Sequence, residues 1–128
     1  MYRYDPEKAP DPAEWLELDE GERVLATEDY HRAARVDLPK SARRAHAAFH
    51  VVVENQLALN DDPVLRALRR LMDQELSRHD AVHAIGSILA AEIYDGEALK
   101  DSPETTNARY YASIERLTAK SWRESNDG

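Results

Sequence analysis

The sequence predicts an all-α protein, folded as a single-domain bundle of five or six helices. The chain has 128 residues, four glycines and few runs of β-branched residues, which disfavours a β-sandwich or barrel. Helix-starting and helix-ending signals recur along the chain, with apolar residues at helical spacing between them. We therefore expect one helical domain over residues 1–128, with a proline-rich arm at 1–11 and a loop at 95–103.

The first two predicted helices follow the arm. Three of the six prolines lie in the first twelve residues, which disfavours regular structure there. Asp11 and Pro12 have the order of a helix cap and a first helical position, and they predict a short helix. Asp19 and Glu22 resemble a capping pair and predict a longer helix that reaches about residue 35.

Two further helices are separated by the stretch NDDP. Ser41 is a good cap for a helix that continues to about Leu59. Its three consecutive valines would also suit a strand, but the flanking alanines and the helical spacing of the apolar residues favour a helix. Asp62 and Pro63 then begin a helix whose leucines form a conventional buried stripe.

The last two predicted helices lie on either side of the loop at 95–103. Ser77 to Asp80 has the S-x-x-D pattern of a helix start, and this helix runs to about Tyr94. Ser102 and Pro103 begin the last helix, which we expect to continue unbroken to about residue 122.

Charge and composition weigh against several classes of protein. The formal net charge of −8 repels phosphate backbones, so we expect no nucleic-acid binding. The absence of cysteine excludes disulfides, thiolate nucleophiles and sulfur-bound zinc. The sequence has neither a long apolar run nor a signal-peptide core, so we expect no membrane association and a cytoplasmic location.

The histidines carry the most specific chemical signal. His46, His50 and Glu54 are spaced i, i+4 and i+8, which places them on one face of a helix. His79 and His83 repeat the i, i+4 spacing on a second helix. If the two faces meet, imidazoles and a carboxylate converge in a group that suits zinc, iron or another divalent ion. All five residues are therefore candidate metal ligands.

A structural polar network is the alternative role for the same residues. A buried histidine usually bonds a carbonyl or an acid, and His50 with Glu54 at i, i+4 can satisfy each other. His31 has acidic neighbours and is expected to be an exposed helix histidine, with a role as a further ligand as the alternative.

The order of His31, His50-x-x-x-Glu54 and His79-x-x-x-His83 resembles that of the hemerythrin-like di-iron bundles. Those bundles add a histidine and an aspartate on the last helix. Here the last predicted helix has no histidine, so a complete hemerythrin site is not supported. The H-E-x-x-H motif of zinc proteases is also absent, and E-x-x-H occurs only once, at Glu28 and His31, whereas ferritin-like di-iron proteins carry it on two helices.

Two blocks of the sequence, HAAFHVVVENQLALNDDPVLRALRRLM and LSRHDAVHAIGSILAAEIY, resemble the bacterial domain-of-unknown-function family numbered 1841. That family has a histidine-rich helix ending in E-x-Q-L and a D-x-H-[ED]-A-x-H segment. The resemblance covers about residues 41–94. It implies a small helical bacterial protein, supplies no activity, and points by position to His50, Glu54, Gln56, His79 and His83.

Three functions follow from these observations. The first is a helical interaction or oligomerisation module whose buried His/Glu cluster rigidifies the bundle. The alternative is a divalent-metal protein with histidines from two neighbouring helices, and the third is a non-metal enzyme with His50 or His83 as general base. The arm and the 95–103 loop are candidates for docking between subunits, so a homo-oligomer is one expected state. The sequence names no protein partner.

Overall fold

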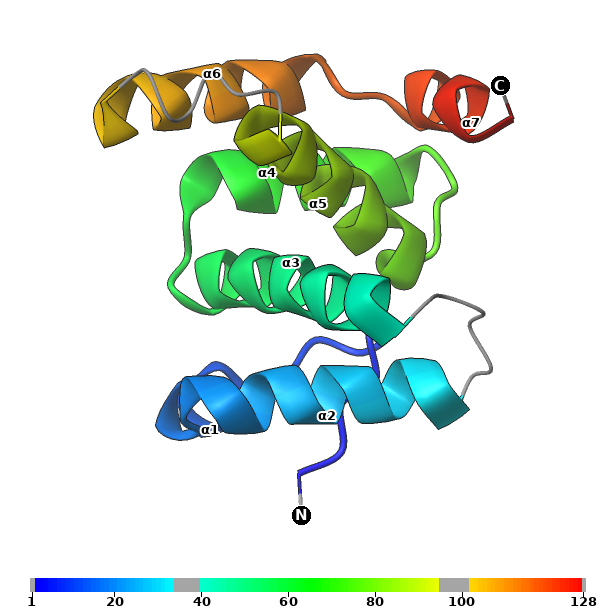
Figure 1. Cartoon of the computed structure of the whole chain (residues 1–128). Helices are drawn as coiled ribbons and strands as arrows, with labels where there is room; N and C mark the ends of the chain where they lie inside the picture. Colours follow the sequence, from blue (N-terminus) through cyan, green and yellow to red (C-terminus); the bar gives the residue numbers. More distant parts are fainter. Residues whose placement is uncertain (1, 34–39, 95–101, 128) are drawn as a thin grey trace.

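The computed structural model describes residues 2–33, 40–94 and 102–127 of the chain. The helices of this part are stacked in layers, with α3 between the N-terminal helices and the C-terminal ones (Figure 1). They are α1 (Pro12–Glu17), α2 (Glu20–Ala33), α3 (Lys40–Ala58), α4 (Asp62–Asp73), α5 (Arg78–Tyr94), α6 (Pro103–Arg116) and α7 (Ala119–Asp127). The predicted all-α bundle is confirmed, and the described residues form seven helices where five or six were expected.

The predicted starts of α1, α2 and α6 are confirmed by capping bonds, whereas the predicted cap Ser41 lies inside α3, which begins at Lys40, and α4 follows Asp61, which makes no capping bond. The Glu14 amide donates to Asp11 Oδ1 over 3.0 Å at the start of α1. Before α2, the Glu22 amide donates to Asp19 Oδ1 over 2.8 Å, which forms one half of a capping box. Ser102 caps α6 by accepting from the Thr105 amide. Residues 95–101 of the expected loop lie outside the described residues.

The last predicted helix is wrong as a single element, because the chain breaks between α6 and α7 at Leu117. This residue is extended (φ −68°, ψ 132°), and Thr118 and Ser121 cap the start of α7. Arg70 of α4 donates to the Leu117 carbonyl at 3.0 and 3.2 Å and to the Ile114 carbonyl at 2.5 Å. A guanidinium from another helix thus satisfies carbonyls that a continuous helix would have used itself.

Helix α3 is covered on two sides by different apolar clusters. Val51 faces the N-terminal layer, where it packs with Tyr4 and Trp15. Val53 faces the other way, into a core shared with residues of α4, α5 and α6, among them Leu71. This second core also encloses α5, so α3 and α5 pack directly against each other. The two helices that carry the spaced histidines are therefore neighbours.

The N-terminal arm, which was expected to lack regular structure, packs against α3 and α5. Tyr4 is only 4% exposed. Arg78, at the start of α5, donates to the Pro6 carbonyl over 2.9 Å and forms a bidentate ion pair with Glu54 of α3, with both N–O distances 2.8 Å. Both partners of this ion pair are buried. One ion pair thus holds two helices and the arm together.

Among the described residues, no helix has the length and apolar character needed to cross a membrane.

Replacement of Glu54 by alanine is expected to lower the free energy of unfolding by about 3–5 kcal/mol, because it leaves the buried Arg78 guanidinium without a counter-charge. Urea denaturation of wild type and variant measures this. Arg66→Ala is the matched control, since Arg66 pairs with Asp62 and Glu115 on the exposed surface and should change stability far less. Equal losses in the two variants would contradict the assigned role of the buried pair.

Candidate metal centre

All five histidines of the chain meet in one cluster between α2, α3 and α5. His46 Nε2 lies 3.1 Å from His31 Nε2 and 2.8 Å from His83 Nε2. His79 Nε2 lies 3.1 Å from His83 Nε2. The His50 ring lies 4.6 Å from that of His83, measured between centroids. The i, i+4 spacing on α3 and on α5 puts each pair on the face where these helices cross.

Four of these side chains form a group of potential ligand atoms that could hold a metal ion. His31, His50, His79 and His83 each offer one ring nitrogen, and these nitrogens all lie within 4.8 Å of one another. His31 and His50 are buried, while His79 and His83 are partly buried. The group therefore has a closed side and a side that solvent can approach.

The structure changes the expected role of two residues. His31 was expected to be exposed, but it is only 2% exposed because α2 packs on α3 and turns this side chain into the cluster. Glu54, a candidate ligand, lies beside the histidines with its carboxylate already bonded. Arg78 donates to both of its oxygens and the Tyr4 hydroxyl donates to Oε2 over 2.5 Å.

Hydrogen bonds on the far side of the rings define the tautomers of the two most buried histidines. His31 Nδ1 lies 2.8 Å from the Thr27 carbonyl, which can only accept, so we assign the proton to Nδ1. The Tyr4 hydroxyl donates to Glu54, so its oxygen accepts from His50 Nδ1 at 3.2 Å. In both rings, Nε2 then carries a free lone pair towards the cluster, as in histidines that bind metals.

The contacts inside the cluster cannot all be hydrogen bonds. A neutral imidazole has one N–H, which points in one direction, yet His46 Nε2 lies close to two other Nε2 atoms. His50 Nε2 is buried and has no hydrogen-bond partner among the described residues. Since a stable buried polar network pairs every member, this cluster lacks the full pairing that a purely structural role requires.

Burial favours the neutral, metal-binding form of all five rings. It is the main cause that lowers the pKa of His46 to about 4 and the pKa of His83 to about 3. It also lowers the pKa of His31, His50 and His79. Repulsion from the neighbouring imidazoles adds to the effect on His46, His50 and His83. The rings are thus uncharged at neutral pH, each with one protonated nitrogen and one free lone pair.

Acidic side chains of the arm lie on the side of His79. Asp5 and Glu7, together with Asp80, raise the pKa of His79 against the larger effect of burial. Glu7 Oε1 also accepts from the His79 amide over 2.7 Å. These carboxylates provide negative charge beside a cluster whose own ligand atoms are neutral.

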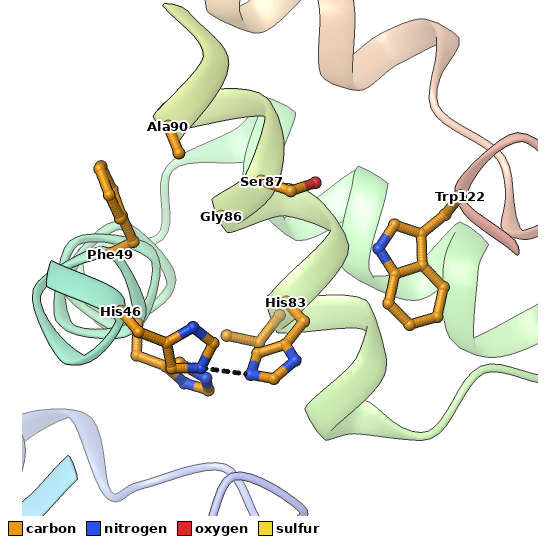
Figure 2. Close-up of a pocket in the computed structure, with 9 residues that line it drawn as sticks. His46, Phe49, His83, Gly86, Ser87, Ala90 and Trp122 are labelled. Carbon is orange, nitrogen blue, oxygen red and sulfur yellow. Dashed lines mark hydrogen bonds between the residues drawn. The ribbon is translucent and has the colours of Figure 1, made fainter. Parts of the chain in front are cut away.

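A cavity of about 280 Å³ adjoins the cluster on the side of α7. His46, His50 and His83 form one part of its lining, and Figure 2 shows Phe49, Ala90 and Trp122 around the rest. The remaining lining residues are Val82, Gly86 and Ser87.

The sequence did not indicate several residues that support the histidines. Tyr4 lies in an arm without regular structure, and its 46-residue separation from His50 leaves no local pattern. Arg78 directly precedes the histidine pair of α5, but only the tertiary structure reveals its partner Glu54. Thr27 precedes His31 by four residues, so helical spacing alone could have suggested that contact.

The sequence matches no protein-family model, and neither the comparison with curated proteins nor that with solved structures finds a significant match.

The metal-free protein is expected to lose stability as the pH falls from about 7.5 to about 5. The unfolded histidines take up protons near pH 6.5, whereas the folded rings, with lowered pKa values, resist protonation. Each ring that gains a proton only on unfolding steepens the slope by up to about 1.4 kcal/mol per pH unit, less where solvent screens it. Denaturation in the presence of chelator measures this slope.

His83→Gln is the comparison variant, because it removes one of these titrating rings. Its stability should depend less steeply on pH than that of the wild type. Parallel pH profiles for the two proteins would show that His83 is already free to protonate in the folded state.

Proposed function

We propose that this chain is a divalent-metal-binding protein whose centre is formed by His31, His50, His79 and His83. The observation that supports it most directly is the convergence of four ring nitrogens within 4.8 Å, one of them the unpartnered Nε2 of His50. Metal–nitrogen bonds of about 2.1 Å place neighbouring ligand nitrogens about 3.0–3.4 Å apart. The Nε2 atoms of His79 and His83 are already 3.1 Å apart, and all four nitrogens lie within 4.8 Å, so the more distant rings have to move closer to bind an ion.

The donor set narrows the choice of metal. Neutral imidazoles suit zinc, iron and neighbouring transition metals, whereas magnesium and calcium prefer oxygen ligands. The Glu54 carboxylate is taken up by Arg78 and Tyr4, so the centre we propose is made of imidazole alone. His46 is not one of the four, although it lines the cavity and its Nε2 lies 3.1 Å from His31 Nε2 and 2.8 Å from His83 Nε2.

The bonds behind the rings support the same function. Tyr4 links His50 to Glu54, and Arg78 holds that carboxylate in place. Such a chain of partners fixes the orientation of a ligand histidine and raises its basicity. A site of this kind stores, senses or uses a metal ion; the chemistry depends on what reaches the open side.

An interaction or oligomerisation module remains the competing proposal. The observation in its favour is the Glu54–Arg78 pair, which joins α3, α5 and the arm through side chains of the chain itself. In that case the histidines pack the bundle and bind no ion. Metal content separates the two proposals.

We expect protein purified without chelator to bind one zinc or cobalt(II) ion per chain, and His50→Ala to lower the affinity at least about 100-fold. His50 supplies a buried ligand nitrogen with no other partner. Elemental analysis and competition with a chelating dye measure content and affinity. Val53→Ala, which removes buried atoms from α3 outside the cluster, is the control for lost stability and should retain the metal.

His46→Ala tests whether His46 is a fifth ligand of the metal. It should retain one metal per chain, because the four-histidine group remains complete. Loss of metal from both histidine variants would extend the centre to five ligands, whereas a wild type without metal would favour the interaction module.

Tyr4→Phe should weaken metal binding about 10–100-fold while the metal-to-chain ratio at saturation stays at one. The phenylalanine ring fills the same space but cannot accept from His50 Nδ1 or donate to Glu54. Tyr2→Phe is the control, since Tyr2 lies on the same arm and packs against Trp15. Equal metal affinities in the two variants would show that Tyr4 does not support the metal centre.

A further inference from the structure

The cavity beside the cluster differs in its two parts. One end is formed by His46, His50 and His83, and the remainder by Phe49, Val82, Gly86, Ser87, Ala90 and Trp122. Figure 2 shows the rings of His46 and His83 meeting at that end, with Phe49 and Trp122 on opposite sides of the space. A polar floor with apolar walls is the common form of a small-molecule site.

The described residues of the walls carry no charged side chain. The nine of them that line the cavity include no Lys, Arg, Asp or Glu. The Ser87 hydroxyl donates to the Ala84 carbonyl over 2.7 Å, so its hydrogen is already used within the helix. The polar groups that remain for a ligand are the imidazoles, the indole N–H of Trp122 and the accepting oxygen of Ser87, none of which carries a charge. A charged group placed against these walls would lose its hydration without compensation.

The histidine end of the cavity also contains the ring nitrogen that has no hydrogen-bond partner among the described residues. His50 is 3% exposed, lines the cavity and has an unpartnered Nε2, while the three other ligand nitrogens come from α2 and α5. Four ligands leave one or two positions open on an ion that accepts five or six. Of the four proposed ligands, His50 and His83 line the cavity, so a molecule in this space would lie beside the ion that these residues would hold.

We propose that the cavity binds a small, neutral molecule with an apolar body, which reaches the bound metal through a single donor atom. This inference rests on the proposed metal-binding function. The volume of about 280 Å³ equals the space of roughly nine water molecules, enough for one aromatic ring beside the donor group. Phe49 and Trp122 line this space, so such a ring would lie beside aromatic side chains.

The test uses three probes with one donor group and different tails: imidazole, 4-phenylimidazole and imidazole-4-acetate. They are titrated into cobalt(II)-loaded protein, and binding is read from the visible absorption of the cobalt. We expect 4-phenylimidazole to bind at least about tenfold tighter than imidazole, because its phenyl ring leaves water for apolar walls. Imidazole-4-acetate should bind more weakly than imidazole, since its carboxylate finds no cation there.

Ala90→Leu tests whether the preference arises in this cavity. Ala90 lines the space, and a leucine there reduces its volume. The variant should bind cobalt as the wild type does but lose the preference for 4-phenylimidazole. Ala91→Leu is the matched control, because Ala91 is exposed on the same helix and is not among the lining residues.

The outcomes separate the two proposals. Cobalt bound in the wild type without a preference for the phenyl probe, or with a preference that survives in Ala90→Leu, overturns the inference about the cavity and leaves the metal centre standing. Absence of cobalt binding overturns both. Cobalt content measured after each titration excludes removal of the metal by the probes.

Discussion

The buried ion pair of Glu54 and Arg78 is the interaction on which the rest of the structure depends. It joins α3 to α5 and, through the Pro6 carbonyl, attaches the N-terminal arm. A buried charge without its partner costs several kcal/mol, so these segments stay together or separate together. The same carboxylate accepts from Tyr4, which in turn orients His50. Stability of the fold and geometry of the cluster therefore depend on one pair of side chains.

Two polar residues on the same face of α3, Glu54 and His50, have different roles. Glu54 serves the fold, while His50, one turn earlier on the same face, presents a free nitrogen to the cluster. Residues Asp5 and Glu7 of the arm supply negative charge on the side of His79. The centre thus has neutral ligand atoms and acidic groups around it. This charge distribution suits a divalent cation held by imidazole.

The two sides of the histidine cluster also differ in how open they are. The arm and α2 close one side. There the Nδ1 atom of His31 is hydrogen-bonded to the Thr27 carbonyl, and that of His50 to the Tyr4 hydroxyl. The other side opens on an apolar cavity that ends at Trp122 of α7. The break between α6 and α7 matters because Trp122 of α7 lines this cavity. A single straight helix would carry residue 122 onward along the axis of α6, whereas the extended Leu117 ends α6 before α7 begins.

Local sequence signals were sufficient for most of the fold. Caps such as Asp11, Asp19 and Ser102 act on amides within three residues, so their effect is readable in sequence. The same holds for the i, i+4 histidine pairs, whose shared faces follow from helix geometry. The break at Leu117 was missed because part of its stabilisation comes from Arg70, 47 residues earlier in the chain.

The sequence by itself therefore determined an all-α chain with two histidine-bearing helices, because helix propensity, capping and periodicity are local properties. The tertiary structure alone decided that α2 adds His31, that Tyr4 stands behind His50, and that Glu54 is bonded to Arg78. These contacts join residues that lie far apart in the chain. Their formation depends on how whole helix faces pack, and no spacing along the sequence records that packing.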